Sequence, residues 1–372
     1  MSVLGAAKTW LETSRTLGMG NPSFREAMGW RGRRPVVVAV GGNSFDGMER
    51  PTAGNIAALL AAGNNLIITH GNGPQVGRLL LKFPHKTTAE CVYLTQIEMG
   101  GTLKREIEVM AEVRGLQVRV EVVPTRVVVG EKDPAFNNPT KGIGPFYNLL
   151  ELQEGGLGDL VKLPELGMYK LRRPDGQEWF IKEVAKGDKP FRRVVSSPKP
   201  IQIFSKDLER IVSGMREGKL VVAVGGGGVP VSISLKGEVV NQEAVIDKDL
   251  ASALLARELK ARGLIISAEP KRVALDFGKR NQKDIDYFWL KQMLFYLKRG
   301  HFKPGTMGEK IEAGINFLRN GGNLFLVTNP ELDWIKWQGT LATRGVDVTG
   351  RIWNMARRVG LVSSDLQRWL VV

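Results

Sequence analysis

Short apolar runs that lead directly into glycine-rich turns constrain the fold of this chain more than any other feature. The clearest cases are VVVAV before GGN, LIIT before HGNG and LVVAV before GGGG, at Val36–Val40, Leu66–Thr69 and Leu220–Val224. Similar apolar runs occupy residues 118–123, 264–267 and 324–328. Because most of the runs are apolar throughout rather than alternating, they are typical of strands buried on both faces of a sheet.

Helical patterns lie between the strand-like runs. They cover Thr88–Val113, the Ala- and Leu-rich Asp249–Arg262, and Glu309–Arg319, which stops before Asn320-Gly321-Gly322. Strand, glycine turn and helix in alternation predict a mostly parallel sheet with helices on both faces. The expected fold is therefore α/β, a three-layer αβα sandwich with a mostly parallel central sheet.

The stretch from about residue 131 to 200 breaks this alternation. It is rich in proline, glycine and charge, and it contains short strand-like segments such as MYKLRR and EWFIKEV. We interpret it as a small inserted subdomain that protrudes from a main domain of residues 35–341. Residues 1–34 and 342–372 are then terminal extensions. The Trp-rich tail after Pro330 is expected to serve packing or an oligomer contact; its tryptophans are Trp334, Trp337, Trp353 and Trp369.

Composition excludes several kinds of site and favours anionic partners. The chain has 372 residues with 53 Lys and Arg against 38 Asp and Glu, a formal net charge of +15, which favours phosphates, nucleic acid or acidic lipid. A single cysteine rules out an intrachain disulfide and a cysteine-based zinc site, and no two of the three histidines have metal-ligand spacing. We assign no metal ligands. Without a run of ~20 apolar residues or a secretory signal core, the chain is expected to be cytoplasmic and free of membrane contact.

Glycine loops at the carboxyl ends of strands suit the binding of anions. Ligands of open α/β sheets bind outside these ends, where bare backbone N–H groups and helix N-termini attract negative charge. No known phosphate motif fits, because Gly218-Lys219 and Gly278-Lys279 lack the Ser or Thr of a P-loop, and the GxGxxxG of Gly71–Gly77 lacks a suitably placed acid. One such loop alone indicates a tight turn, whereas three at successive strand ends favour ligand binding.

Three lysines stand beside acids or glycine-rich turns: Lys141 in NPTK, Lys248 in IDKD and Lys310 in GTMGEK. A lone lysine is usually solvated, but lysines in such contexts are better candidates for holding phosphate. Phosphoryl transfer depends mainly on positioning and positive charge, with Mg²⁺ bridging the phosphates. An acceptor that is already an anion needs no general base, so a site of lysines and glycines without a catalytic His or Cys suits this chemistry.

Taken together, several motifs resemble the carbamate kinase family of the amino acid kinase superfamily. They are VVVAVGGNS (residues 37–45 region), THGNGPQVG (69–77), NPTKGIGPF (138–146), VVSSPKPI (194–201), VGGGGVPV (224–231), EAVIDKDLAS (243–252), FGK (277–279) and HFKPGTM (301–307). They recur in the family's order across about residues 35–341. The resemblance implies a homodimer that catalyses reversible, Mg²⁺-dependent transfer between ATP and carbamate, giving ADP and carbamoyl phosphate.

The resemblance also implies roles for individual residues. The half of the domain at about 35–215 would bind carbamate through Gly41, Gly42, Asn43, Gly71, Asn72 and Gly73. The half at about 216–341 would bind the nucleotide through Gly225, Gly226, Gly227, Ser267, Phe277, Lys279 and Met307. Lys141, Lys248 and Lys310 would neutralise the transferring phosphoryl group, Asp247 would orient them, and the insert would act as a lid that brings Lys141 over the site.

Three other functions stay open. The chain could be a related kinase that phosphorylates another small carboxylate, although HGNGPQVG and NPTK argue against this. A nucleotide-responsive regulatory protein without catalysis is motivated by departures on the nucleotide side, among them Glu309 in place of the family's proline and Asp276 in place of asparagine. Nucleic-acid binding is motivated by the net charge alone; no motif for it is present, and we expect no such partner.

Overall fold

The computed structural model describes residues 34–45, 47–154, 157–185, 187–302 and 307–345. The predicted N-terminal extension up to residue 33 and the predicted C-terminal extension beyond residue 345 lie outside the described residues, and so do Trp353 and Trp369. Within the described part, no helix has both the length and the apolar character needed to cross a membrane.

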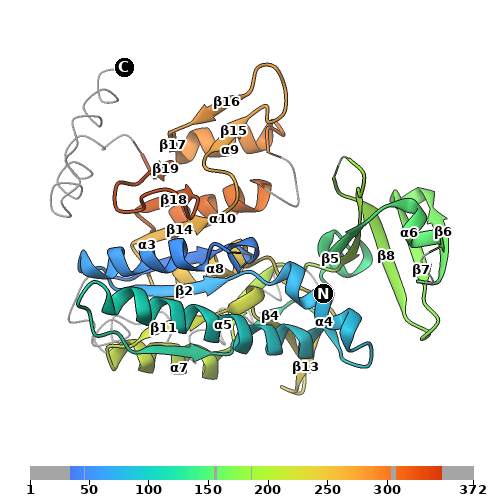
Figure 1. Cartoon of the computed structure of the whole chain (residues 1–372), viewed down its shortest axis with the longest axis horizontal. Helices are drawn as coiled ribbons and strands as arrows, with labels where there is room; N and C mark the ends of the chain where they lie inside the picture. The colour runs from blue at the N-terminus through green and yellow to red at the C-terminus, as the bar shows by residue number, and fades with distance from the viewer. Residues whose placement is uncertain (1–33, 46, 155–156, 186, 303–306, 346–372) are drawn as a thin grey trace.

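An eight-stranded, mostly parallel sheet forms the centre of the described chain (Figure 1). Its strands follow the order β17-β19-β18-β14-β1-β2-β11-β3, and β18 pairs with β19 in the antiparallel sense. The bounds are β1 Val36–Val40, β2 Leu66–His70, β3 Val120–Val123, β11 Leu220–Ala223, β14 Gly263–Ser267, β17 Tyr287–Trp289, β18 Leu324–Thr328 and β19 Thr340–Thr343. All six apolar runs identified in the sequence are strands of this sheet, which confirms the predicted α/β fold.

The sheet separates two helical layers, because successive side chains of a strand point to opposite faces. Val38 packs in one apolar core with α3 and α5, whereas Val37 packs in the other with α7, α8 and α10. The helices are α3 Glu49–Ala61, α4 Gly73–Lys82, α5 Thr88–Glu112, α7 Ser205–Arg216, α8 Lys248–Glu258, α9 Leu290–Lys298 and α10 Met307–Arg319. The predicted three-layer αβα arrangement is therefore confirmed.

Two smaller sheets border the main one. A four-stranded sheet in the order β10-β4-β12-β13 packs against α8 through β10 and against α5 through β12. A two-stranded hairpin, β15 with β16, precedes α9. The strands are β4 Arg126–Val129, β10 Pro200–Ile203, β12 Val229–Ile233, β13 Val239–Asn241, β15 Val273–Leu275 and β16 Lys283–Ile285.

A five-stranded antiparallel sheet projects from the main body, on the right in Figure 1. Its order is β5-β9-β8-β7-β6, and α6 packs with it. The elements are β5 Lys141–Tyr147, α6 Leu149–Glu154, β6 Asp159–Leu163, β7 Met168–Arg172, β8 Glu178–Glu183 and β9 Phe191–Val195. They lie within the stretch interpreted as an insert, and they enclose a core of their own around the buried Trp179.

Two glycines join this projecting sheet to the main body at backbone distance. A Cβ atom placed on Gly77 of α4 would lie 2.1 Å from the Cα atom of Gly144 in β5. Gly144 itself has φ +71°, a left-handed conformation that glycine adopts without strain. The α4–β5 contact therefore depends on the absence of side chains at both positions.

Trp334 has the packing role expected for the Trp-rich tail. It is buried, and its Nε1 atom donates a hydrogen bond of 2.9 Å to the carbonyl of Asn329. The side chain of Asn55 in α3 donates to the carbonyls of Pro330 and Leu332 at 2.9 and 3.0 Å. These bonds hold the segment after β18 against the helical layer that contains α3.

Candidate active site

Helix α8 begins where three charged residues follow one another. Asp247 is its N-cap: Oδ1 accepts the backbone N–H of Asp249 at 2.9 Å and that of Leu250 at 3.2 Å. This cap starts the helix at Lys248, one residue before the start that the apolar pattern predicts. Lys248 and Asp249 therefore lie in the first turn of α8, beside the carboxyl end of β2, where Thr69 bonds Ser252 at 2.6 Å.

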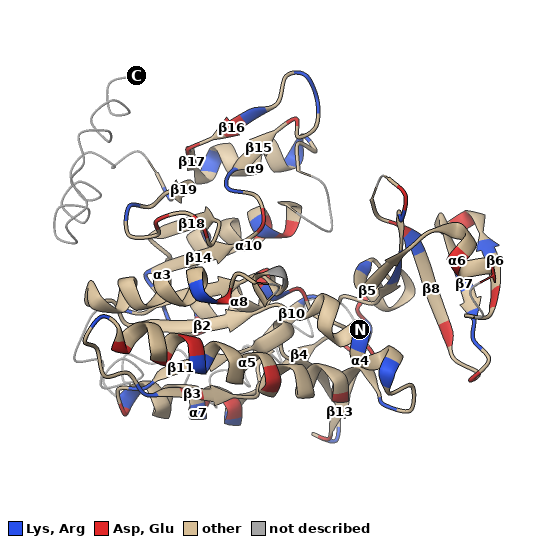
Figure 2. Ribbon diagram, in the orientation of Figure 1, with Lys and Arg blue, Asp and Glu red and all other residues tan. Residues whose placement is uncertain are grey.

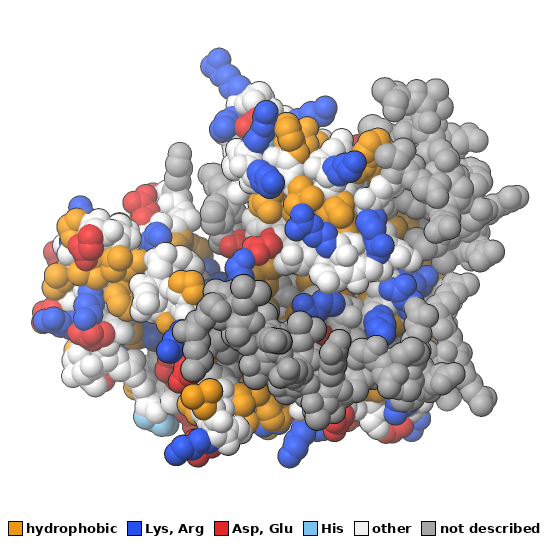
Figure 3. Space-filling model, turned by 180° about the vertical axis from the view of Figure 1, so that it is seen from behind, with side chains coloured by type: hydrophobic (Ala, Val, Ile, Leu, Met, Phe, Trp, Pro, Cys, Tyr) orange, Lys and Arg blue, Asp and Glu red, His pale blue; other side chains and the backbone are white. Residues whose placement is uncertain are grey.

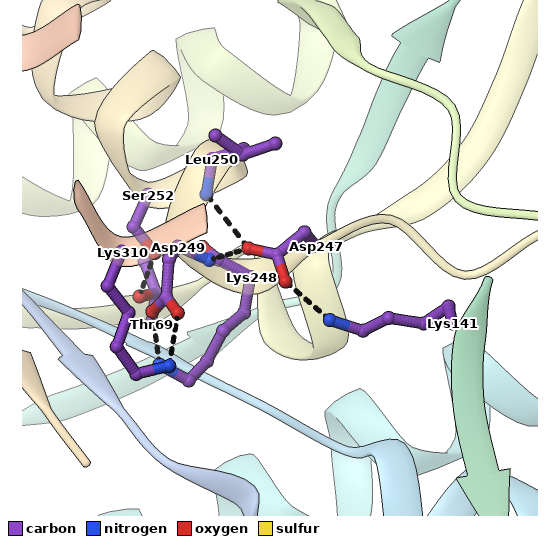
Figure 4. A network of polar contacts seen from close by, with 8 residues as sticks. All are labelled: Thr69, Lys141, Asp247, Lys248, Asp249, Leu250, Ser252 and Lys310. Atoms are coloured by element: carbon purple, nitrogen blue, oxygen red, sulfur yellow. Dashed lines mark hydrogen bonds and ion pairs between the residues drawn. The ribbon is translucent and has the colours of Figure 1, made fainter. Parts of the chain in front are cut away.

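Lys141 reaches this helix start from the first residue of β5 in the projecting sheet. Its Nζ atom pairs with Oδ2 of Asp247, the oxygen that the helix cap does not use (Figure 4). Asp247 therefore has two tasks: it ends the loop that leads into α8, and it holds a lysine that comes from the insert.

Asp249 joins the other two lysines. Its Oδ1 pairs with Nζ of Lys248, and its Oδ2 lies 2.9 Å from Nζ of Lys310 in the first turn of α10 (Figure 4). The Asp249 side chain is only 2% exposed. The three lysines singled out in the sequence, supplied by β5, α8 and α10, thus meet around two buried carboxylates.

Opposing charges set the protonation of this cluster. Burial alone would raise the pKa of Asp249, but the charges of Lys248 and Lys310 outweigh it, so its pKa is lowered. For Asp247, burial is likewise outweighed by Lys141 and Lys310, and its pKa is lowered. Both carboxylates are therefore ionised at neutral pH.

The lysines respond differently to the same surroundings. Burial lowers the pKa of Lys248, with a further lowering from the charge of Lys310. Burial also acts to lower the pKa of Lys310, but Asp249 and Asp247 outweigh it and its net pKa is raised. Three lysines against two carboxylates give the cluster a surplus of positive charge, which attracts an anion such as a phosphoryl group.

The two loops expected to hold carbamate lie side by side, and the second of them contacts Lys248. A Cβ atom on Gly71 would lie 3.0 Å from the backbone nitrogen of Gly42 and 3.0 Å from Cδ of Lys248. Asn43 belongs to the short 3-10 helix η1, Gly42–Phe45, that follows β1. Gly73 opens α4, and a Cβ atom there would lie 3.7 Å from the carbonyl oxygen of Gly142 in the insert.

The glycine loop at Gly225–Gly227 packs against the loop at Gly71–Gly73. Gly225, Gly226 and Gly227 form the buried turn η4, and a Cβ atom on Gly226 would lie 2.0 Å from Nδ2 of Asn72. That Asn72 nitrogen donates to Oγ1 of Thr95 at 2.8 Å, so the side chain is held inside the protein. The assignment of the three glycines to nucleotide binding stays a prediction.

His70 fills the space between these loops. The ring is buried, with Nδ1 3.1 Å from the carbonyl oxygen of Gly71, and it lies edge-on to Phe45 with 5.6 Å between centroids. A Cβ atom on Gly225 would lie 2.4 Å from Nε2. Burial lowers the pKa of His70 to about 4, so the imidazole is neutral at physiological pH and has a packing role.

The remaining predicted nucleotide residues lie in three places. Ser267 is the buried last residue of β14, and its carbonyl oxygen would lie 3.2 Å from a Cβ atom on Gly41. Met307 begins α10, one turn before Lys310. Phe277 and Lys279 are exposed on the turn between β15 and β16, at the upper edge of Figure 1. The described contacts of the lysine cluster do not include these two.

Asp249 is the site residue that sequence reasoning missed. The prediction assigned the orienting role to Asp247, whereas Asp247 pairs with Lys141 and Asp249 holds both Lys248 and Lys310. The available signal was the acid on each side of Lys248 at a helix start. Within the described ranges, no group of three or more His, Cys, Asp or Glu side chains could hold a metal ion.

Charged residues of both signs occur on the parts of the described chain that Figures 2 and 3 show. Figure 2 shows Lys and Arg interspersed with Asp and Glu on the helices that cover the sheet. On the opposite face, Figure 3 shows basic side chains scattered among neutral and apolar ones over the described part. The expectation that the chain has no nucleic-acid partner stays a prediction.

Comparison with known proteins gives consistent matches. No family model matches the chain. It is 35% identical to a carbamate kinase of Pyrococcus horikoshii over 318 residues, which cover 80% of this chain and 94% of the relative. It is 34% identical to a carbamate kinase-like protein of Escherichia coli over 317 residues, which cover 80% and 93%.

Solved structures agree with these relatives. Carbamate kinase from Giardia lamblia bound to AMP-PNP matches with a TM-score of 0.67 and 26% identity, over 84% of this chain and 99% of that one. A crystal structure from Aeropyrum pernix K1 matches with a TM-score of 0.68 and 36% identity, over 84% and 100%.

Proposed function

This chain belongs to the carbamate kinase family, and from that premise we propose that it transfers a phosphoryl group reversibly between ATP and carbamate, giving ADP and carbamoyl phosphate. The observation that carries the proposal is the meeting of Lys141, Lys248 and Lys310 around two buried aspartates, beside two glycine loops. Such a site holds a dianionic phosphoryl group through ammonium groups and bare backbone amides.

The chemistry needs no general base from the protein. Carbamate is already an anion, so its oxygen can attack phosphorus directly once the two reactants are aligned. We assign the loops at Gly41–Asn43 and Gly71–Gly73 to carbamate, because they lie against each other and the second lies against the side chain of Lys248. The nucleotide would approach from the side of α10, where Met307 and Lys310 lie in the first turn.

The lysines would stabilise the charge that spreads over the equatorial oxygens during transfer. Asp249 keeps Lys248 and Lys310 together, and Asp247 keeps Lys141 at the start of α8. Because Lys141 is the first residue of β5, we propose that the projecting sheet acts as a lid over the acceptor half. The same proposal divides the main domain into an acceptor half at about 35–215 and a nucleotide half at about 216–341.

Mg²⁺ fits this site as an ion that the nucleotide carries. The nearest carboxylates, Asp247 and Asp249, are both engaged by lysines, and the described residues form no metal-holding group of their own. Bound together with the nucleotide, the ion would neutralise part of the phosphate charge. A cytoplasmic location is part of the proposal, since ATP and ADP are the reaction partners.

We also propose a homodimer that forms through α5 and the hairpin of β12 and β13. The outer face of α5 exposes Tyr93, Leu94 and Ile97, each by more than a third of its surface. The first strand of the hairpin, β12, packs on α5, and the hairpin exposes Leu235 and Val239. A monomer rarely leaves so much apolar surface on neighbouring elements, and a second copy of the chain would cover it.

The test is the formation of ATP from ADP and carbamoyl phosphate, measured with and without Mg²⁺. We expect turnover that depends on the ion and disappears with a chelator. A panel of acyl phosphates in the same assay separates carbamate from other small carboxylates as the acceptor. ATP binding without turnover on any member of the panel would contradict the proposal and favour a regulatory protein.

A further inference from the structure

Two buried ammonium groups share one carboxylate in this site. Asp249 pairs with Lys248 and with Lys310, whose side chains are 12% and 17% exposed. Burial favours the loss of a proton from each of the two lysines, and the neighbouring carboxylates oppose that loss.

The surroundings select Lys248 for this loss. Asp249 and Asp247 hold the pKa of Lys310 above its ordinary value in spite of burial. Burial and the charge of Lys310 instead lower the pKa of Lys248. Lys248 therefore releases its proton more readily than Lys310 does, while Asp249 stays ionised and continues to hold Lys310.

The Lys248 side chain also lies against the acceptor loop at Gly71. Its Cδ and Cε atoms would lie 3.0 and 3.4 Å from a Cβ atom on Gly71, and the backbone nitrogen of Gly42 would lie 3.0 Å from the same point. The end of this side chain thus lines the place where, on the function proposed above, the carbamoyl group is bound.

We propose that Nζ of Lys248 is a carbamoyl acceptor, modified by carbamoyl phosphate bound in these loops. The inference rests on the proposed function. Carbamoyl phosphate is a mixed anhydride that can be attacked at phosphorus, which makes ATP, or at the carbonyl carbon. In the second reaction an N–C bond forms and the C–O bond to phosphate breaks. Phosphate leaves with the electron pair and takes the proton of the amine, so the products are N-carbamoyl-lysine and inorganic phosphate, without oxidation or reduction.

The modification would inactivate the enzyme slowly when nucleotide is scarce. With ADP bound, the phosphoryl group has an acceptor in line and transfer at phosphorus is fast. Without ADP, the bound anhydride stays beside the Lys248 amine, and proximity favours attack on carbon. A carbamoylated lysine is neutral, so it can no longer pair with Asp249 or stabilise phosphoryl charge.

The test uses the full chain incubated with carbamoyl phosphate in the absence of ADP, followed by peptide mass spectrometry. We expect the modification rate at Lys248 to saturate with carbamoyl phosphate and to exceed that of Lys199 and Lys336, both 69% exposed, by about tenfold or more. In the second arm the chain is incubated with potassium cyanate, because cyanate is the reactive breakdown product of carbamoyl phosphate. The exposed lysines should react first in this arm. ADP or AMP-PNP should protect Lys248 in the first arm.

Two variants sharpen the result. Lys248→Arg should show no modification at this position. Lys310→Met should slow the modification of Lys248 at saturating carbamoyl phosphate, because Asp249 then serves Lys248 alone and favours its ammonium form; an unchanged or faster rate would overturn the shared-carboxylate argument.

Parallel assays of ATP formation separate the two proposals. Suppose that the protein forms ATP but that Lys248 stays unmodified, or that the exposed lysines react before Lys248 as they should with cyanate. Either result would overturn this inference alone. Absence of ATP formation would overturn the proposed function and the inference together.

Discussion

Nζ of Lys310 lies 2.9 Å from Oδ2 of Asp249, and this contact ties the first turn of α10 to the first turn of α8. The two helices lie on the same face of the central sheet and start near its carboxyl edge. The same carboxylate holds Lys248. One buried side chain therefore determines where two of the three lysines stand.

Asp249→Asn should reduce kcat/KM by about 10²-fold or more, because the lysines lose the group that aligns them for the transition state. Loss of a buried partner should also lower the free energy of unfolding by about 3–5 kcal/mol. Steady-state kinetics and urea denaturation measure the two effects. Asp333→Asn, which removes an exposed pair with Lys336, is the control and should change neither; wild-type kinetics in Asp249→Asn would refute the role.

Gly77→Ala should destabilise the seat of the projecting sheet. The new methyl group would lie 2.1 Å from the backbone of Gly144, where neither partner has a side chain that can move away. We expect a lower melting temperature and a higher KM for carbamoyl phosphate. Gly101→Ala is the matched helical control, since its nearest neighbour is a flexible Arg105 atom at 3.8 Å; it should be neutral or stabilise by up to about 1 kcal/mol. Equal melting temperatures for the two variants would contradict the close contact.

The raised pKa of Glu258 predicts that the folded protein loses stability as the pH rises from mildly acidic to neutral values. Burial raises the pKa of this carboxyl to about 7, against 4.5 for the ordinary group. The folded state therefore binds a proton more tightly than the unfolded state, so the added stability is complete below pH 4.5 and is lost as pH rises through 7. The change is about 3 kcal/mol at most. In Glu258→Gln, where an amide oxygen can still accept the N–H of Ile203, it should disappear from urea denaturation curves at pH 5 and 8. An unchanged pH dependence in the variant would exclude Glu258 as its source.

Ile97→Asp should separate the proposed dimer into monomers. A charge in the middle of the apolar face of α5 would lose its hydration if a second copy covered it. Sedimentation velocity over a range of concentrations measures the association. Val113→Asp, at the exposed end of the same helix, should leave it intact. A dimer that persists in Ile97→Asp would place the interface elsewhere.

The strands of the central sheet could be predicted from the sequence because their signal is local. Five consecutive apolar residues at Val36–Val40 need no distant partner to indicate a doubly buried strand, and the observed bounds are identical. The bounds of α8 were less accurate. It begins at Lys248 rather than Asp249, because its first turn depends on the cap at Asp247, and it ends at Glu258 rather than Arg262, just before Lys260 takes a positive φ of 50°.

The lysine cluster could be predicted only in part. Lys141, Lys248 and Lys310 stand in distinctive motifs, and the structure brings them together. The pairing of aspartates with lysines depends on long-range contacts. Lys141 and Asp247 are 106 positions apart in the sequence, and Lys310 and Asp249 are 61 positions apart. No local pattern distinguishes Asp247 from Asp249. The role of Gly77 was hidden for the same reason: it looked like part of a loop motif, whereas it lies inside α4 and is small because Gly144 packs on it.

The three lysines come from β5, α8 and α10, so the site is complete only when the insert and both helices are in place. Regained turnover during refolding would consequently report the last assembly step, after the sheet and both helical layers have already formed. Spectroscopic signals from secondary structure should recover earlier than enzymatic activity, and the delay between them would measure how long the insert takes to dock.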